Sequence, residues 1–285
     1  MGSMVASGDV TAGQLRRRAP VSAAARAASK VPQITVFFWI IKILTTAQGE
    51  AASDYLAYRI DPFIAVAVTG LALVIALVLQ LRTREYVAWI YWLTVDMVAI
   101  FGTMAADGMH IKLGVPYSAS TAFFAVVLAV VLVTWYRAEK TLSIHSIRTR
   151  RREAFYWATV LATFALGTAL GDMTATTLHL GYLTSGILFT LIFAVPGVAY
   201  RWLRLNAIAA FWFAYIVTRP LGASYADWMG VSHAAGGLGF GRGPVAIVLT
   251  IPIVALVAYL AVTRRDVEQA AAAPRPQSRP GRHRS

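Results

Sequence analysis

Long apolar segments alternate with short polar loops along most of the chain. Each segment is about 20 residues long, the length that a helix needs to cross the hydrocarbon core of a bilayer. The pattern predicts eight membrane-spanning helices, at residues 33–56, 63–81, 86–104, 117–136, 154–176, 181–200, 205–229 and 244–262. The predicted fold class is therefore an all-α, polytopic membrane protein.

One spacing recurs in every second segment. An aromatic residue precedes a tryptophan, a glycine follows ten positions after the tryptophan, and an aspartate follows five positions after the glycine. The tryptophans are Trp39, Trp92, Trp157 and Trp212, the glycines are Gly49, Gly102, Gly167 and Gly222, and the aspartates are Asp54, Asp107, Asp172 and Asp227. Such self-similarity at a regular interval indicates an internal repeat.

The repeating unit is predicted to be a pair of antiparallel helices, and four such units follow one another. We expect the repeats at residues 33–82, 85–137, 153–202 and 205–264, between basic tails at residues 1–32 and 265–285. The tails lack apolar periodicity, which predicts disorder. Because each helical hairpin returns to its starting side, all four repeats should have the same orientation in the membrane.

Composition and charge agree with a membrane protein. Hydrophobic residues make up 58% of the chain and charged residues only 14%, against roughly 25% in soluble domains. The net charge is +13, but 21 of the 26 lysines and arginines lie at the two chain ends and in the loops 82–84, 137–152 and 201–204. This distribution predicts that both termini are cytoplasmic. It gives no basic folded face, so nucleic-acid binding is not expected.

The repeated arrangement resembles a bacterial membrane-protein family of four tandem two-helix repeats, each with a characteristic tryptophan. The likeness covers roughly residues 33–262 and is strongest at 38–56, 155–181 and 211–230. The second repeat departs most, with Thr103 where the first has Glu50. The family's repeat has no known function, so the resemblance implies the topology and a place in the bacterial cytoplasmic membrane but no reaction.

The repeated aspartates are the first candidate site. Successive helical residues are rotated by about 100°, so positions 0, 4, 7, 11 and 15 after each tryptophan share one stripe, and this stripe carries the polar residues. Polar atoms facing lipid are costly, so the stripe should point into the bundle. Four aspartates around a common axis would bind cations or protons. The alternatives are aspartates solvated among the lipid headgroups, or aspartates that cap neighbouring helices.

Four further charges lie within the apolar segments and break the fourfold pattern: Lys42, Glu50, Asp96 and Arg219. We expect at least one buried ion pair among them, Arg219 with Asp96 or with Glu50, since unpaired charges in lipid are costly. Such a pair is either static or a switchable gate in an ion pathway. Glu50 and Asp96 are also candidates for ion or proton binding.

The remaining signature residues favour structural roles. The glycines let helices approach closely, and the tryptophans are expected to pack or to anchor at the membrane interface rather than to stack on a substrate. His110, His179 and His233 follow three of the aspartates and are weak candidates for a divalent metal site, the alternative being solvated loop histidines. No other cofactor is expected.

These features predict a transporter-like membrane protein that moves a small solute, a cation or a proton-coupled substrate. The site would comprise the repeated aspartates with Glu50 and Asp96, and the gate would comprise Lys42 and Arg219. The alternatives are an intramembrane enzyme, perhaps metal-dependent, and a non-catalytic scaffold or sensor. The enzyme interpretation is weakened because no HExxH, GxSxG or Walker sequence is present.

Overall fold

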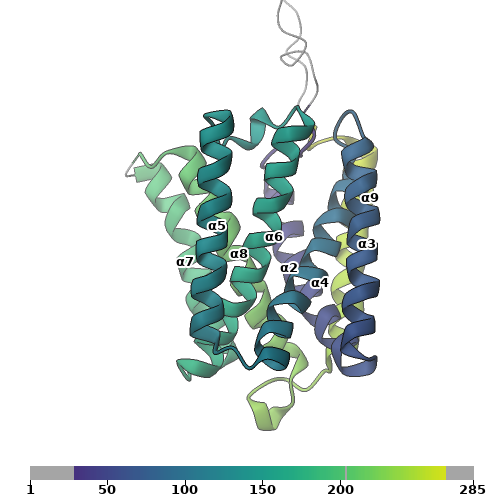
Figure 1. Cartoon of the computed structure of the whole chain (residues 1–285), viewed down its shortest axis with the longest axis vertical. Coiled ribbons are helices and arrows are strands. Elements are labelled where there is room, and N and C mark those ends of the chain that lie inside the picture. Colours follow the sequence, from purple (N-terminus) through teal and green to yellow (C-terminus); the bar gives the residue numbers. More distant parts are fainter. Residues whose placement is uncertain (1–28, 203, 268–285) are drawn as a thin grey trace, which may run out of the picture.

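The computed structural model describes residues 29–202 and 204–267. In this part of the chain eight long helices run side by side, and no strand occurs (Figure 1). The helices are α2 (Val36–Arg59), α3 (Pro62–Arg82), α4 (Ala88–Leu113), α5 (Tyr117–Glu139), α6 (Arg150–Asp172), α7 (Tyr182–Trp202), α8 (Ala207–Gly230) and α9 (Arg242–Thr263). The predicted basic tails lie mostly outside the described residues.

The all-α prediction is confirmed, and six helices of the described chain are long and apolar enough to cross a membrane: α3, α4, α5, α6, α7 and α9. Helices α2 and α8 have the required length but are more polar. They carry buried charged side chains, among them Lys42, Glu50 and Arg219. These two helices lie among the others, where polar side chains can be satisfied by protein instead of lipid.

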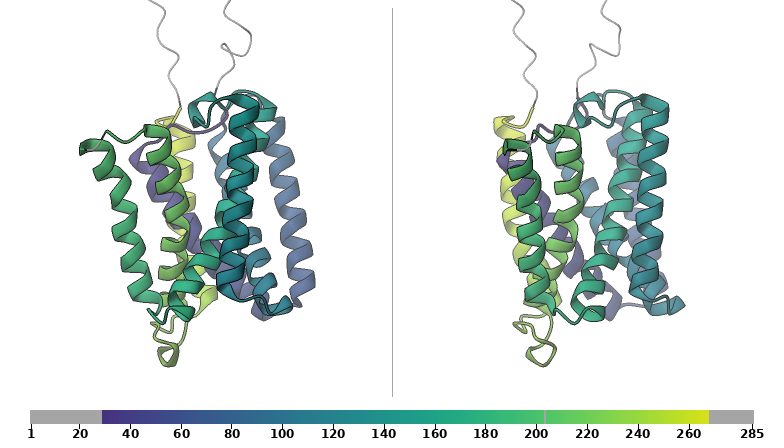
Figure 2. Two further views of the ribbon diagram at one scale, coloured as in Figure 1. Left: turned by 60° about the vertical axis from the view of Figure 1, so that its left-hand side comes forward. Right: turned by 90° about the vertical axis from the view of Figure 1, so that its left-hand side faces the viewer.

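The four signature helices form an inner ring. Each of α2, α4, α6 and α8 packs against its two neighbours, and the contact between α8 and α2 closes the ring. The outer helices α3, α5, α7 and α9 pack mainly on the inner helix of the following repeat, so that α9 returns to α2 (Figures 1 and 2). Each outer helix thus contacts the inner helix of the next repeat more than the inner helix of its own repeat, and successive repeats interlock.

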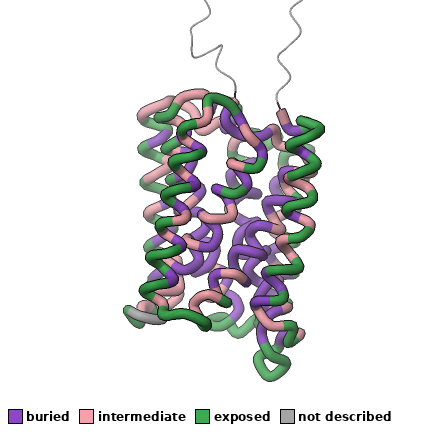
Figure 3. Tube along the Cα trace, turned by 90° about the vertical axis from the view of Figure 1, so that its right-hand side faces the viewer, coloured by how far each residue is buried: buried purple, intermediate pink, exposed green. Residues whose placement is uncertain are grey.

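Burial follows this arrangement. Buried residues are concentrated on the inner helices, and exposed residues on the outward faces of the outer ones (Figure 3). The exposed outer residues are largely apolar, such as Val66, Leu71 and Val74 on α3 and Ile247 and Ile251 on α9. Apolar faces of this kind are suited to lipid.

The signature tryptophans close the ring by aromatic contacts. In every repeat the aromatic residue before the tryptophan packs against the tryptophan of the next repeat. The pairs, with the distances between their ring centroids, are Phe38–Trp92 (5.7 Å), Tyr91–Trp157 (5.5 Å), Tyr156–Trp212 (6.3 Å) and Phe211–Trp39 (5.8 Å). The last pair joins the fourth repeat to the first. Trp92, Trp157 and Trp212 are buried, so they pack inside the ring instead of anchoring it at the membrane interface.

The signature glycines, ten residues after the tryptophans along the inner helices, form a second set of contacts between successive repeats. Each meets the residue seven positions after the tryptophan of the next repeat, and a Cβ atom at any of these glycines would overlap that neighbour. The pairs are Gly49–Ala99, Gly102–Phe164, Gly167–Arg219 and Gly222–Thr46. The prediction that these glycines allow close helix approach is confirmed.

Both ends of the described chain lie at one end of the bundle, which we call the basic end. The Lys30 backbone N–H donates to the carbonyl of Ile147 (3.0 Å), and that of Gln33 donates to Asp266 (2.9 Å). The Tyr86 hydroxyl donates to the Asp266 carboxylate (2.5 Å). Burial raises the pKa of Asp266, and the Tyr86 hydrogen bond opposes this shift. The signature helices run from this end to the opposite end, which we call the acidic end.

Candidate cation site at the acidic end

The inner ring brings the four repeated aspartates together around Glu50. Each aspartate lies fifteen residues after its tryptophan, about 22 Å along the helix, so all four reach the acidic end. Glu50, Asp54 and Asp107 offer carboxylate oxygens within 4.8 Å of one another, and so do Glu50, Asp172 and Asp227. We call these five residues the carboxylate cluster. Their convergence follows from the ring, because equivalent residues of four like-oriented repeats face one axis.

Accessibility differs within the carboxylate cluster. Glu50 is 3% exposed and Asp227 is 7% exposed, whereas Asp54, Asp107 and Asp172 are half-buried. The cluster thus combines two buried carboxylates with three that are partly exposed at the acidic end. Just beyond Asp172 the helix continues as a π-helical turn, η2 (Met173–Thr177), a distortion that is frequent at functional sites.

Arg219 lies directly below the cluster, toward the basic end. Its Nη2 atom donates hydrogen bonds to the Glu50 carboxylate and to the hydroxyls of Thr103 and Thr168. These three acceptors occupy the same position, eleven residues after the tryptophan, in repeats one, two and three. One nitrogen of the fourth repeat therefore contacts the other three repeats at equivalent points.

We call the contacts of Arg219 with Glu50, Thr103 and Thr168 the Arg219 hub. It accounts for the different residues that the first and second repeats carry at this position. Thr103 and Thr168 present neutral hydroxyl oxygens where the first repeat presents the Glu50 carboxylate, so one guanidinium charge faces one carboxylate charge. Of the two predicted partners of Arg219, Glu50 is confirmed. Asp96 is not its partner, and in the described part of the chain its Oδ1 atom has no hydrogen-bond donor.

Lys42 does not pair with an acid in the described chain. Its Nζ atom lies over the rings of Phe164 (3.9 Å to the centroid) and Tyr215 (4.3 Å). The Arg219 guanidinium lies over the same Phe164 ring, 5.5 Å from its centroid. The aromatic faces, which carry partial negative charge, thus face the Lys42 ammonium where a carboxylate could have paired with it.

The sequence did not indicate a role for Arg242, which lies in the predicted loop between the last two spans. The Nε atom of Arg242 donates to the Asp54 carboxylate (2.5 Å), and its guanidinium lies over the ring of Tyr58, 4.6 Å from the centroid. Arg242 opens the last helix, and α9 packs on α2, which carries Asp54. Only that packing brings Arg242 and Asp54 together, and no spacing in the sequence predicts this contact.

The carboxylate cluster has more negative than positive charge. Glu50 pairs with Arg219 and Asp54 pairs with Arg242. Asp107, Asp172 and Asp227 form no ion pair within residues 29–202 and 204–267. Ionised carboxylates this close together repel one another, so the cluster favours protons or a bound cation.

The structure does not bring the candidate histidines to the cluster. His110 stacks on Tyr117 (3.6 Å between centroids) and shares a hydrogen bond through Nδ1 with the Val115 carbonyl. His179 and His233 are exposed. In the described chain, the groups close enough to hold a metal ion contain only carboxylates, and an all-oxygen ligand set suits Mg²⁺, Ca²⁺ or Mn²⁺.

Fold and site together define a helical, membrane-type repeat protein with an acidic cluster at one end of an inner ring. The chain belongs to the family described as "Repeat of Unknown Function (DUF347)", which matches residues 37–86, 90–141, 155–206 and 210–266. The predicted membership of a four-repeat family of unknown function is thereby confirmed. No curated protein and no solved structure matches the chain.

Proposed function

We propose that this protein is a membrane carrier for a small cation, or for a solute whose movement is coupled to protons. The observation that carries the proposal is the charge imbalance of the carboxylate cluster: Asp107, Asp172 and Asp227 have no cationic partner in the described chain. Binding a cation or protons would relieve their mutual repulsion. Secondary transporters built from internal repeats commonly place their substrate and ion sites where the repeats meet.

In the proposed mechanism the ring is open to ions at the acidic end and closed below it. Arg219 and Glu50 form the first barrier, and the aromatic contacts between repeats form the second. A cation that competes with Arg219 for Glu50 would weaken the hub that joins all four repeats. Asp96, about 16 Å from Asp107 toward the basic end, is the proposed inner station.

The proposed orientation follows from the distribution of charge. Basic loops favour the cytoplasmic side, so we place the basic end and both termini in the cytoplasm and the carboxylate cluster on the outer side. In this arrangement α2 and α8 also cross the bilayer, shielded by the outer helices, which gives eight spans. The bilayer proposed is a bacterial cytoplasmic membrane.

Flux measurements test the proposal. The purified protein is reconstituted into liposomes, and uptake is followed for protons, Na⁺, K⁺, Mg²⁺, Ca²⁺ and Mn²⁺. We expect wild-type protein to carry at least one of these ions, and Asp172→Asn to reduce that flux by about tenfold or more, as expected when an interaction of at least about 1.4 kcal/mol is lost.

The matched control is Asp61→Asn. Asp61 is exposed before α3, where its side chain accepts from the backbone N–H groups of Phe63 and Ile64. Asparagine caps helices as well as aspartate does, so this variant removes a charge and keeps the cap. Its flux should equal that of wild type. Wild-type flux in Asp172→Asn would rule out the proposed role of the cluster.

A further inference from the structure

The carboxylate cluster contains two groups of three acids, and both groups include Glu50. We call Glu50, Asp54 and Asp107 the first acid group, and Glu50, Asp172 and Asp227 the second acid group. In each group the carboxylate oxygens lie within 4.8 Å of one another. Two oxygens that bind the same Ca²⁺ ion, each at about 2.3–2.6 Å, lie at most about 5 Å apart. The spacing within each group therefore suits one ion.

The two groups differ in the protein cations that face them. In the first acid group, Arg219 pairs with Glu50 and Arg242 pairs with Asp54. In the second acid group the described chain supplies only Arg219, and neither aspartate forms an ion pair. Asp227 is 7% exposed, so solvent reaches its carboxylate poorly. Because a buried carboxylate without a partner is costly, the second acid group has the stronger need for an external cation.

Arg242 is held in place beside Asp54. Its Nε atom donates to the Asp54 carboxylate (2.5 Å), its guanidinium lies 4.6 Å from the centroid of the Tyr58 ring, and its stem packs against Gly230 at the end of α8. The preceding loop returns to α8, because the backbone N–H groups of residues 238–240 donate to carbonyls at and just after the end of that helix. Arg242 is therefore a fixed counter-charge of the first acid group.

The outer helices explain why Asp54 has a second arginine beside it and the other aspartates do not. Helix α9 packs on α2, α5 packs on α6, and α7 packs on α8. The first residues of these outer helices are Arg242 on α9, Tyr117 on α5 and Tyr182 on α7. Tyr117 lies within electrostatic range of Asp172, and Tyr182 within that of Asp227. The equivalent place is thus filled by a cation at Asp54 and by neutral phenols at Asp172 and Asp227.

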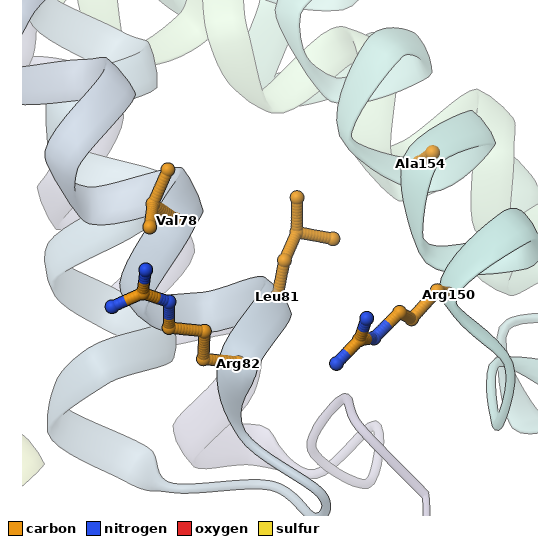
Figure 4. A pocket seen from close by; sticks show the side chains of 5 residues that line it. All are labelled: Val78, Leu81, Arg82, Arg150 and Ala154. Carbon is orange, nitrogen blue, oxygen red and sulfur yellow. The ribbon is translucent and has the colours of Figure 1, made fainter.

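A pocket at the basic end, between α3 and α6, does not provide comparable ligands. Val78, Leu81 and Ala154 give it a mostly apolar lining, and Arg82 extends away from Arg150 (Figure 4). In the described chain, the groups of acids that are close enough to hold an ion lie at the acidic end. A cation therefore finds its ligands there.

We propose that the second acid group binds one hard divalent cation, Mg²⁺, Ca²⁺ or Mn²⁺, and that Arg242 occupies the corresponding place in the first acid group. All-oxygen ligands suit these ions. The two unpaired aspartates carry two negative charges, which one divalent ion neutralises, whereas a monovalent ion would leave one of them uncompensated. This site presupposes the proposed cation binding by the carboxylate cluster, and it specifies which acids bind and how many ions.

Counting bound Mn²⁺ tests the site. The purified protein in detergent micelles is titrated with Mn²⁺, and the free ion is measured by electron paramagnetic resonance, which gives the number of bound ions and their dissociation constant. We expect one ion per wild-type chain and two in Arg242→Gln, because glutamine keeps a hydrogen-bond donor near Asp54 but removes the charge that fills the first acid group. Arg242→Lys, which keeps the charge, should again bind one.

Asparagine substitutions identify the ligands. Asp172→Asn and Asp227→Asn should each weaken binding by at least about tenfold, the low end of what loss of a residue that supports a metal site costs, and Asp107→Asn should weaken it less. In the Arg242→Gln background, Asp107→Asn should remove the second ion. Equal effects of Asp107→Asn and Asp172→Asn on the wild-type ion would overturn its assignment to the second acid group.

The matched control for Arg242→Gln is Arg59→Gln. Arg59 is exposed in the last turn of α2, at the acidic end, and forms no ion pair in the described chain. The control removes the same charge from the same end and should still bind one ion. A second ion in both variants would mean that general surface charge controls binding, and would overturn the role of Arg242. A single ion in Arg242→Gln would overturn it as well.

Failure of this site and failure of the proposed carrier give different results. Flux of protons or Na⁺ into liposomes, without any Mn²⁺ binding, would overturn the divalent site and leave the carrier standing. One bound Mn²⁺ per chain without flux of any ion would support the site and overturn the carrier.

Discussion

Replacing Arg219 by methionine should destabilise the protein by about 3–5 kcal/mol, because it leaves the buried Glu50 carboxylate without its counter-charge. The change also removes the donor to Thr103 and Thr168, so one substitution weakens contacts between the fourth repeat and the other three. Methionine keeps most of the side-chain stem that packs against Gly167. The free energy of unfolding in mixed micelles measures the effect.

The matched variant is Arg219→Met combined with Glu50→Gln. It removes both charges, so no ionised group remains buried alone, and we expect most of the lost stability to return. This non-additivity is the mark of a direct interaction in a double-mutant cycle. If the double variant lost as much as the sum of its single variants, Arg219 and Glu50 would not form the energetic unit that the structure shows.

Replacing Gly222 by alanine should destabilise the contact between the first and fourth repeats, where α2 packs on α8. The new Cβ atom would overlap the Thr46 hydroxyl and come within 2.8 Å of the Ala47 backbone nitrogen. The Thr46 side chain cannot change rotamer without loss, because its hydroxyl donates a hydrogen bond to the Thr218 carbonyl on α8 (3.1 Å). We expect a loss of about 1–3 kcal/mol from overpacking, with about 1 kcal/mol more if that hydrogen bond breaks.

Gly197→Ala is the matched control for Gly222→Ala. Gly197 lies within α7, and a Cβ atom there would meet nothing within 4 Å. Alanine favours the helix by up to about 1 kcal/mol over glycine, so Gly197→Ala should keep or raise the unfolding temperature while Gly222→Ala lowers it. Equal unfolding temperatures in the two variants would contradict the close contact between α8 and α2.

The repeat signature predicted the parts of the site that depend on helical geometry. The spacing from tryptophan to glycine to aspartate placed these residues on one face, and the need to bury polar atoms pointed that face inward. In the structure the tryptophan of each repeat contacts the preceding repeat around the ring, the glycine contacts the next repeat, and the aspartates meet around Glu50. Intrahelical spacing sufficed here because each inner helix is continuous from its tryptophan to its aspartate.

The sequence could not predict features that depend on how the helices pack. Arg242 reaches Asp54 only because α9 packs on α2, at the opposite end of the chain. Lys42 was assigned to the proposed gate from its charge alone, and only the packing of the inner helices places Phe164 and Tyr215 beside it. The choice of Glu50 over Asp96 as the partner of Arg219 likewise depends on the rotation of the helices in the ring, which charge counting leaves open.

Thermal unfolding in a series of cations tests the central claim most directly, because a ligand that binds only the folded protein stabilises it by about 2.7 kcal/mol at one hundred times its dissociation constant. Our account predicts that at least one cation raises the unfolding temperature of wild type and of Asp61→Asn, and that the rise is lost in Asp172→Asn. The same cation-dependent rise in Asp172→Asn as in wild type would contradict a cation site at the carboxylate cluster.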